Sequence, residues 1–574
     1  MGTVAQQLID SLAAAGVRRI YGVPGDSLNG LTDAIRTTAG IEWSHVRHEE
    51  AAAFAAAAEA ELSGRLAVCA GSCGPGNMHL INGLYDAART RVPVLAIAAQ
   101  IPSEEIGSGY FQETHPQELF RECSVYAELV SDPAQMPRML RTAMQAAIAR
   151  RGVAVLVIPG DVALKDADST HLAGAFAPAP RVLPSESELR ELAGELNAAG
   201  RVTILAGAGA AGAHDEVVAL ADRLAAPIVH ALRGKEHLEW ENPFDVGMTG
   251  LLGFASGYRA MEAAQTLLVL GSDFPYRQFY PEHARVLQVD LRGEQLGRRA
   301  QLTLGVVGDV RETAAALLPL LSEGRDRSHL EDATAHYAKT RTKLDDLARP
   351  AKDGKPLHPQ HVAARIDALA AEDAVFIPDV GSPVVYAARY LTMNGKRSLI
   401  GSFIHGSMAN ALPQAIGAAS LNPARQVVTL SGDGGLTMLL GELFTLVQSK
   451  LPVKVVVFNN SSLNFVELEM KAAGFVTFGT GLENPDLAAV ARAVGLAAWK
   501  VENSSELDEA LAAAFAHDGP ALVDVTTARQ ELTIPPKIGL AQAKGFALYA
   551  LRSVMSGRGD ELLDLAATNW RQLL

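Results

Sequence analysis

Residues 427–465, VVTLSGDGGLTMLLGELFTLVQSKLPVKVVVFNNSSLNF, decide the fold of this chain. An apolar strand over 427–430 ends at Ser431-Gly432-Asp433-Gly434-Gly435, and we expect an apolar-rich helix over about 439–448. A second apolar strand follows over 453–458. Two strands joined by one helix form a βαβ unit, so they are parallel and their carboxyl ends share one edge of a sheet.

Polar side chains follow both strands of this unit. Asp433 comes just after the first strand and Asn460 just after the second, so we expect them side by side where open α/β sheets bind ligands. The glycines allow backbone N–H groups to approach an anion, and the helix start adds its positive dipole end. A carboxylate, a carboxamide and a loop carbonyl suit Mg²⁺ and leave positions for phosphate oxygens and water. The stretch therefore predicts a site for Mg²⁺ and a phosphate-bearing ligand.

The composition is that of a soluble globular protein. The chain has 574 residues, 48% of them hydrophobic and 20% charged, with a net charge of −14. The acidic balance argues against nucleic-acid binding. No apolar run approaches the eighteen or so residues of a membrane span. Cys69, Cys73 and Cys123 provide neither a disulfide framework nor a zinc-ligand spacing, and we expect them reduced in a cytoplasmic protein.

Strands and helices alternate along most of the chain, which predicts α/β domains with doubly wound parallel sheets. We predict three such domains and a C-terminal tail, over residues 1–165, 185–335, 356–527 and 528–574. A stretch rich in Pro, Ala and Ser, 165–187, separates the first two domains. A charged, partly helical stretch over 323–355 precedes the third.

The second domain contains a formal G-x-G-x-x-G at 207–212, directly after the strand 202–206. No convincing acidic residue for contact with a ribose follows about twenty positions later, because the strand 228–230 runs into Arg233. A dinucleotide can still bind this domain, but we do not place its pyrophosphate on that loop.

The spacing of Gly432-Asp433-Gly434, 25 intervening residues and Asn460 resembles the signature of thiamine-diphosphate enzymes. In a strand–helix–strand context this match is specific, and we favour it over an ordinary glycine turn followed by a polar strand end. The family's domain order, pyrimidine-binding, central and diphosphate-binding, corresponds to the three predicted domains.

Further stretches resemble the bacterial pyruvate dehydrogenases (quinone), the ubiquinone-linked pyruvate oxidases of this family. These stretches are 47–54, 69–77, 109–115, 231–237, 274–277, 401–410, 556–560 and 568–570. The resemblance implies thiamine diphosphate, Mg²⁺ and FAD as cofactors and pyruvate as the substrate, oxidised to acetate and CO₂. It also implies that electrons pass to a membrane quinone (ubiquinone or menaquinone), and that the enzyme is a homotetramer. The implied localisation is cytoplasmic, with the enzyme peripheral on the inner face of the cell membrane and the C-terminal tail bound to phospholipid.

The resemblance also implies roles for individual residues. Glu49 would bond N1′ of the aminopyrimidine and favour its imino tautomer. The alternative is a first-turn helix carboxylate stabilised by the helix dipole. Met408 would hold the cofactor in a bent conformation and Gly406 would offer a carbonyl to N4′, whereas Met408 alone would be assigned to core packing.

The other implied site residues fall into four groups. The metal ligands are Asp433, Asn460 and the carbonyl of Ser462. The remaining thiamine-diphosphate contacts are Ser407, Gly434, Gly435, Ser461, Leu463, Asn464, Phe465 and Val466. The substrate pocket comprises His79, Phe111, Gln112, Phe465 and Glu469. The FAD contacts are Thr249, Gly250, Leu251, Leu252, Phe274, Pro275, Tyr276, Arg277, Gln278 and Asp290.

Two other functions remain open. A non-redox relative, such as an acetolactate synthase with a structural flavin, shares every thiamine motif. A catalytically silent lipid-binding protein is disfavoured because Glu49, Asp433 and Asn460 are all present. In the tail, residues 560–574 have helical apolar spacing, but interfacial helices are usually basic and this one is acidic. A helix docked on its own core is the alternative to the implied lid that covers the active site and is released to lipid.

Overall fold

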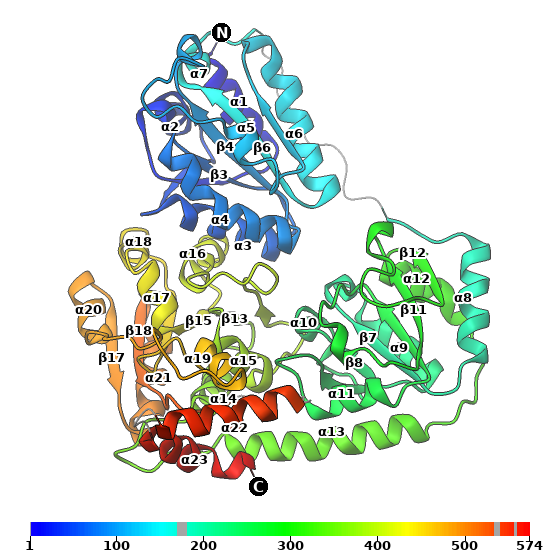
Figure 1. The fold of residues 1–574 in the computed structure, drawn as a ribbon. Coiled ribbons are helices and arrows are strands. Elements are labelled where there is room, and N and C mark those ends of the chain that lie inside the picture. Colours follow the sequence, from blue (N-terminus) through cyan, green and yellow to red (C-terminus); the bar gives the residue numbers. More distant parts are fainter. Residues whose placement is uncertain (1, 169–180, 533–539, 556–558, 574) are drawn as a thin grey trace.

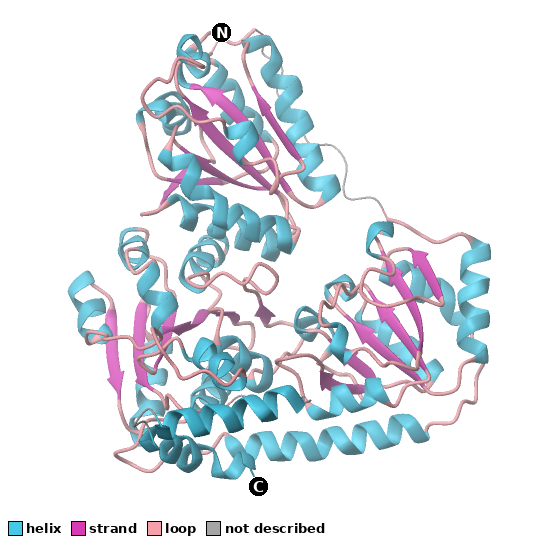
Figure 2. Ribbon diagram, viewed as in Figure 1, coloured by secondary structure: helices cyan, strands magenta, loops and turns pink. Residues whose placement is uncertain are grey.

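The computed structural model describes residues 2–168, 181–532, 540–555 and 559–573. Each of three six-stranded sheets lies between helices, and every pairing between named strands is parallel (Figures 1 and 2). The predicted fold class, α/β with three doubly wound parallel sheets, is confirmed. Each sheet lies within one predicted domain range, whereas the helix over 328–347 extends past residue 335.

The N-terminal sheet has the strand order β2-β1-β3-β4-β6-β5. Its strands are β1 (Arg19–Gly22), β2 (Glu42–His45), β3 (Ala67–Gly71), β4 (Val94–Gln100), β5 (Tyr126–Leu129) and β6 (Val153–Pro159). Its helices are α1 (Val4–Ala14), α2 (Asn29–Thr37), α3 (Glu49–Ser63), α4 (Pro75–Thr90), α5 (Pro116–Leu119), α6 (Met136–Arg150) and α7 (Gly160–Leu164). Strand β5 was not predicted, because this short edge strand is only partly buried and lacks a continuous apolar run.

The central sheet has the order β12-β11-β10-β7-β8-β9. Its strands are β7 (Val202–Ala206), β8 (Ile228–His230), β9 (Asp245–Met248), β10 (Thr266–Leu270), β11 (Arg285–Asp290) and β12 (Leu304–Val307). Its helices are α8 (Glu186–Ala198), α9 (His214–Leu224), α10 (Lys235–Leu238), α11 (Ala255–Glu262) and α12 (Val310–Leu317). The long helix α13 (Ser328–Leu347) follows. The glycines at 207–212 form a 3₁₀ turn over Ala208–Ala210, and α9 begins only at His214.

The C-terminal sheet has the order β14-β13-β15-β16-β18-β17. Its strands are β13 (Val375–Pro378), β14 (Ser398–Leu399), β15 (Val427–Gly432), β16 (Lys454–Asn459), β17 (Ala497–Val501) and β18 (Ala521–Thr526). Its helices are α14 (Pro359–Leu369), α15 (Ser382–Tyr390), α16 (Ala411–Leu421), α17 (Asp433–Met438), α18 (Glu442–Gln448), α19 (Asn464–Ala472), α20 (Leu487–Val494) and α21 (Leu507–Ala516). The tail adds α22 (Leu540–Met555) and α23 (Gly559–Leu573).

The crossover between β15 and β16 differs from its prediction. We expected one helix over about 439–448, but α17 begins at Asp433 itself and α18 follows after a break at 439–441. Glycine has a low helix propensity, so we predicted that the helix begins after Gly434 and Gly435. In the fold both positions need glycine, because a Cβ on Gly435 would overlap the Asp379 carboxylate and one on Gly434 would lie 2.7 Å from Leu463.

The N-terminal and C-terminal domains meet along alanine-rich α3, which packs between α4 and α16. A Cβ on Gly417 of α16 would overlap the carbonyl of Ala55, and one on Gly83 of α4 would lie 2.5 Å from the Cβ of Ala53. The three helix backbones therefore approach closely. We call the buried contacts of α3 with α4 and α16 the α3 seam.

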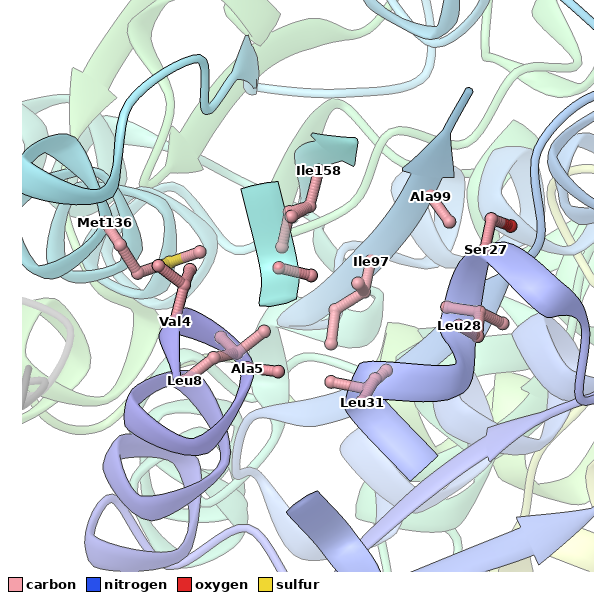
Figure 3. Close-up of a pocket in the computed structure, with 11 residues that line it drawn as sticks. Val4, Ala5, Leu8, Ser27, Leu28, Leu31, Ile97, Ala99, Met136 and Ile158 are labelled. Carbon is pink, nitrogen blue, oxygen red and sulfur yellow. The ribbon is translucent and has the colours of Figure 1, made fainter. Parts of the chain in front are cut away.

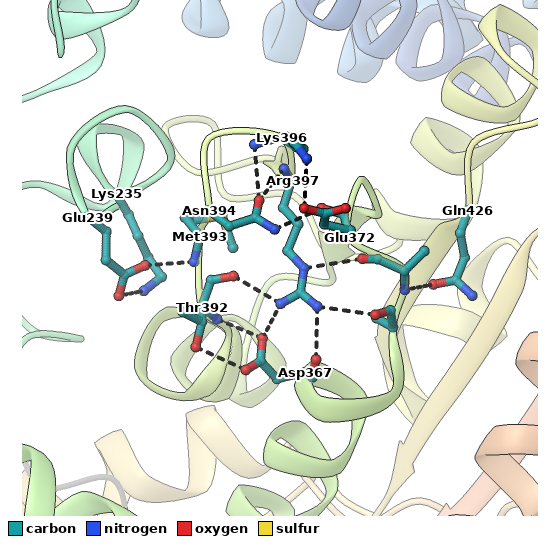
Figure 4. Close-up of polar contacts among 12 residues, drawn as sticks. Lys235, Glu239, Asp367, Glu372, Thr392, Met393, Asn394, Lys396, Arg397 and Gln426 are labelled. Atoms are coloured by element: carbon teal, nitrogen blue, oxygen red, sulfur yellow. Dashed lines mark hydrogen bonds and ion pairs between the residues drawn. The ribbon is translucent and has the colours of Figure 1, made fainter. Parts of the chain in front are cut away.

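The central and C-terminal domains are joined through the loop that follows α15 (Figure 4). Glu239 accepts a hydrogen bond from the N–H of Met393 at 3.0 Å and pairs with Lys235 at 2.5 Å. Arg397 holds the loop by donating to Asp367 at 2.7 Å and to the carbonyl of Thr392 at 3.1 Å. These contacts fix the central domain against the C-terminal sheet.

The N-terminal domain encloses a small cavity of about 20 Å³ between α1, α2 and the strands β4 and β6 (Figure 3). Ser27 is the polar residue among mostly apolar lining side chains such as Leu8, Ile97 and Met136. The space is about that of one water molecule, so we treat it as a packing gap and not as a ligand site. No helix of the described residues is long and apolar enough to cross a membrane.

Candidate functional site

The carboxyl edge of β15 and β16 brings the predicted metal ligands together. Gly432 pairs with Phe458 in the parallel register, so Asp433 and Asn460 leave the sheet at the same edge. The Asn460 Oδ1 accepts a hydrogen bond from the N–H of Ser462 at 3.0 Å, which closes the loop around these residues. Ser461 has a positive φ of 55° within this tight turn.

Asp433 is 2% exposed, and its carboxylate accepts a hydrogen bond from a neutral side chain, the Asn484 Nδ2, at 2.7 Å. Burial raises the pKa of this carboxyl, while Asn484 and the nearby N–H groups of Gly434 and Ser461 act in the opposite direction. A buried carboxylate without a close cationic partner is stabilised by a bound cation. The oxygen donors of Asp433, Asn460 and Ser462 therefore fit Mg²⁺.

The starts of α15 and α17 lie at this same edge, and helix N-termini favour a phosphate group. Gly381 has φ +124° and precedes α15, whose Ser382 donates to the Asn464 Oδ1 at 2.8 Å. Asp379 lies at this edge, and burial raises the pKa of its carboxyl to about 7. Its carboxylate occupies the space that a side chain at position 435 would need, which explains why Gly435 is a glycine. The sequence prediction missed Asp379, Gly381 and Ser382. An apolar strand followed by D-x-G-S-P, with proline in the first helical turn, was the available signal.

The loop 405–408 approaches this edge from the N-terminal domain's side. The Met408 Cε lies 3.4 Å from the place a Cβ on Gly434 would take, so the side chain reaches over the start of α17. Asn82 of α4 donates through Nδ2 to the Ser407 Oγ at 2.8 Å, and its Oδ1 accepts from the His405 Nε2 at 2.8 Å. Gly406 has φ +79°, which this turn requires.

Glu49 is the first residue of α3 and is 7% exposed. Its Oε2 lies 2.9 Å from the Nδ1 of His79, and Gly76 leaves space beside its Oε1. Its neighbour Glu50 accepts a hydrogen bond from Asn82, which also bonds Ser407. The described contacts of Glu49 are therefore within its own domain, and the link to the 405–408 loop passes through Glu50 and Asn82.

The remaining predicted pocket residues come from two places. In the N-terminal domain, the Gln112 Oε1 accepts a hydrogen bond from Cys73 at 3.4 Å, whereas the Phe111 side chain is 78% exposed. In the C-terminal domain, α19 carries Phe465, Val466 and Glu469, of which Glu469 is exposed. The structure brings His79 to Glu49 but records no contact between Phe111 or Gln112 and α19.

The predicted flavin segments lie along the carboxyl edge of the central sheet. Gly250 has φ +98°, and a Cβ there would lie 2.9 Å from the Phe274 ring. Thr249 follows β9 and Asp290 ends β11, four strand positions apart, which corresponds to about 19 Å. The buried Thr249 Oγ1 has no hydrogen-bond partner among the described residues. A long ligand with polar groups, such as a dinucleotide, fits this edge. Leu251, Leu252, Pro275, Arg277 and Gln278 lie in the same two segments.

An arginine-lined crevice of about 630 Å³ opens between the N-terminal and central domains next to Asp290. Its charged residues are Arg89, Arg91, Arg150, Arg151 and Arg292, with Glu122 and Glu294. The five arginines outnumber the two glutamates. Burial, together with Arg292 and Arg151, lowers the pKa of Arg91 to about 10. We call this space the arginine crevice. It fits the phosphates of an anionic cofactor, and the sequence prediction missed it because its residues are scattered along the chain.

The chain combines three α/β domains with a set of oxygen donors at the carboxyl edge of β15 and β16. Sequence comparison identifies the class of enzyme that has this combination. Residues 2–119, 189–317 and 379–525 match the N-terminal TPP binding domain, the central domain and the C-terminal TPP binding domain of thiamine pyrophosphate enzymes. The chain belongs to the thiamine pyrophosphate enzyme family.

Among individual relatives, the chain is 36% identical to the putative thiamine pyrophosphate-containing protein YdaP of Bacillus subtilis, over 98% of each chain. It is 31% identical to the pyruvate oxidase of Lactiplantibacillus plantarum, over 90% of this chain and 87% of that one. An uncharacterised 42.6 kDa protein of Pseudomonas amyloderamosa is 60% identical over 62% of this chain and 90% of its own length. Acetolactate synthases are also relatives.

Proposed function

We propose that the protein is a thiamine-diphosphate- and FAD-dependent pyruvate dehydrogenase (quinone), which decarboxylates pyruvate to acetate and CO₂ and passes two electrons to a membrane quinone. The observation that carries the proposal is an electrostatic link between α19 and the flavin segment. Burial, and after it the charge of the Glu469 carboxylate on α19, raises the pKa of the Tyr276 phenol. A residue predicted to face the substrate therefore acts on a residue predicted to face the flavin, which supports electron transfer between the two cofactors.

When bound, thiamine diphosphate supplies an electron sink for decarboxylation and FAD accepts two electrons. Asp433, Asn460 and the Ser462 carbonyl would hold Mg²⁺ against the diphosphate. Glu49 would hold a proton at N1′, and Met408 would set the cofactor's conformation. Thr249, Phe274 and Asp290 would hold FAD along the central edge, with its phosphates toward the arginine crevice.

The visible spectrum of the purified protein tests this function. Anaerobic pyruvate is expected to bleach the bound flavin, because electrons can leave the substrate only through it. Flavin reduction should be accompanied by one acetate and one CO₂ for each flavin reduced, with water supplying the acetate's second oxygen, and reoxidation by a soluble quinone should restore the spectrum. A flavin that stays oxidised while pyruvate is consumed would overturn the proposal.

The second candidate function is a non-redox condensation of the acetolactate synthase kind. The relatedness to acetolactate synthases favours it, and so does the shared phosphate edge. That enzyme would form acetolactate from pyruvate without flavin bleaching. Product analysis of the same anaerobic sample therefore separates the two functions.

We also propose a membrane partner for the C-terminal tail, on a homotetramer at the inner face of the cell membrane. In α22, Leu551, Val554 and Met555 are 60%, 61% and 79% exposed, and Leu563 of α23 is 75% exposed. Trp570 and Leu573 of the predicted apolar face lie outside the side chains described. The tail also contacts the predicted active-site helix, since α22 packs on α19.

A truncation lacking residues 556–574 tests the tail. It keeps α22 and removes α23, whose Asn569 donates to the Gln530 carbonyl at 2.6 Å. We expect faster pyruvate oxidation with a soluble acceptor in the absence of lipid and loss of pyruvate-dependent liposome binding. An unchanged rate would show that α23 is not an inhibitory lid. Retained liposome binding would place the membrane contact elsewhere.

A further inference from the structure

Three metal-ligating side chains gather at the start of α3, separate from the oxygen ligands at the β15/β16 edge. His48 caps α3, Glu49 opens it, and His79 comes from the second turn of α4. The His79 Nδ1 lies 2.9 Å from the Glu49 Oε2, and the two imidazoles stack with centroids 4.3 Å apart. One ligand atom from each residue lies within 4.8 Å of the other two.

The cluster is open on its imidazole side. The side chains of His79 and His48 are 45% and 36% exposed, whereas that of Glu49 is 9% exposed. A cation can therefore reach the buried carboxylate without any rearrangement of the helices. In a tetrahedral zinc site with bonds of 2.0–2.1 Å, ligand atoms stand about 3.3 Å apart. The three ligand atoms now lie within 4.8 Å of one another, and rotation of the two imidazoles about their side-chain torsions can bring them to the shorter separation that zinc needs.

The donor set selects the kind of metal. Two imidazole nitrogens and one carboxylate, with a fourth position open to solvent, match sites where zinc keeps three protein ligands. Mg²⁺ prefers oxygen donors and octahedral geometry, so it belongs at the Asp433 edge instead. We propose that His48, Glu49 and His79 form a binding site for a late first-row divalent cation, with Zn²⁺ as the best fit.

The site would make the enzyme sensitive to such cations, and this part rests on the proposed function. Glu49 is the predicted partner of the aminopyrimidine, and a carboxylate that holds a metal cannot also hold a proton for N1′. Zn²⁺ and thiamine diphosphate therefore compete for Glu49, and each weakens the binding of the other. Because coupling between two ligands is reciprocal, each lowers the affinity for the other by the same factor.

Zinc binding to the metal-stripped protein, measured by competition with a zinc-chelating dye, tests the site without relying on activity. We expect one Zn²⁺ per chain beyond any bound at the magnesium edge, and the same tight site in Asp433→Ala. His48→Asn should weaken it at least tenfold. Asparagine can still cap α3, so the helix keeps the hydrogen bond from the N–H of Glu50 at 3.2 Å. His283→Asn, at an exposed histidine of the central domain, is the matched control and should bind as the wild type does.

Thermal melting checks that His48→Asn is folded as the wild type is. Glu49→Gln is a second variant and should also lose the zinc site. Wild-type affinity in both variants would overturn the proposal. A second titration, with Mg²⁺ and thiamine diphosphate already present, should weaken zinc binding at least tenfold. Unchanged zinc affinity there would overturn the competition. Neither result depends on flavin bleaching, so a failure of this site and a failure of the proposed function are distinguishable.

Discussion

At the scale of single residues, the carboxyl edge of β15 and β16 depends on its glycines as much as on its predicted metal ligands. Gly434 and Gly435 stand in the first turn of α17, where a Cβ would meet Leu463 or overlap Asp379, so only glycine lets these two side chains pack against the helix start. Asp433, which carries the charge, is buried against neutral donors. Residue chemistry and residue size together therefore set the specificity of this edge.

Glu49→Gln tests the proton held at the start of α3. The variant keeps the side chain's size, so folding and FAD content should match the wild type. Anaerobic reduction of the flavin by pyruvate should slow by about 10²-fold or more, because positioned acid–base groups commonly contribute that factor. Stopped-flow absorbance measures the rate. A variant with more than about a tenth of the wild-type rate would remove Glu49 from this role.

Asp433→Ala tests the magnesium edge. It removes the buried carboxylate, so Mg²⁺-dependent binding of thiamine diphosphate should fall below detection, while FAD content stays unchanged because the central domain is not altered. Fluorescence quenching of the cofactor-free protein follows the binding. His283→Asn serves as the control, and an affinity equal to that of the wild type would contradict the assignment.

At the scale of elements, α19 is held in place by the C-terminal helices. Lys471 of α19 is fully buried, with its Nζ 2.5 Å from the Gln530 Oε1 and over the Tyr549 ring of α22 at 5.7 Å. Burial lowers the pKa of this ammonium group. Gly545 of α22 lies against the Ala472 carbonyl, so the two helices cross at backbone distance. The docking of α22 therefore helps to fix the helix that carries Phe465 and Glu469.

Gly545→Leu tests this crossing. The added side chain would overlap the α19 backbone, so α22 should detach and expose Lys471, with a loss of about 1–3 kcal/mol in the local docking. Limited proteolysis should cut the C-terminal region faster than in the wild type. Ala547→Leu, at an exposed position of the same helix, is the control and should be cut at the wild-type rate. Equal cutting rates for both variants would show that the crossing does not hold the tail.

Sequence patterns predicted the elements with strong apolar runs and failed where packing decides. Strands β15 and β16 were predicted within two residues of their observed ends, because buried parallel strands are continuous apolar runs. The start of α17 was missed, since only the neighbouring Asp379 explains why glycines occupy a helix there. The arginine crevice could not be predicted either, because Arg91, Arg151 and Arg292 converge only in three dimensions. The roles of the predicted cofactor residues remain predictions.

At the scale of the whole molecule, the three domains meet around one guanidinium group. Arg233 of the central domain lies 3.3 Å from Glu61 of α3 and also donates to the Thr90 carbonyl. Asp86 of α4 and Glu236 of α10 are nearby carboxyls, and His237 and Arg425 are the other charged or titratable neighbours. Burial raises the pKa values of Glu61 and Asp86 to about 7. Arg233 thus acts on three acids, and Arg425 also acts on Glu236.

This junction predicts that stability falls as the pH rises from about 4 to about 7 and levels off above that. A carboxyl whose folded pKa is raised contributes stability at low pH, and that contribution is lost as the pH rises through the folded pKa, here about 7. For Asp86 the loss between pH 6 and pH 8 is on the order of 1 kcal/mol, or about 1 °C in Tm for a chain of this length. Differential scanning calorimetry measures it. Asp86→Asn, which can still bond Gln414, should flatten the slope, and a slope equal to the wild type's would contradict the assignment.

The α3 seam has a consequence for how this sequence can change over time. Its small residues look uninformative in a sequence, yet any growth of Ala53, Ala55, Gly83 or Gly417 would push apart helices that touch through their backbones. The same helix begins with Glu49, so a shift in the seam would move the carboxylate that the chemistry is proposed to need. In a library covering every single substitution, we expect these alanines and glycines to tolerate as little change as Asp433. Exposed Leu551 and Met555 of α22 should remain freely variable as long as no membrane is present.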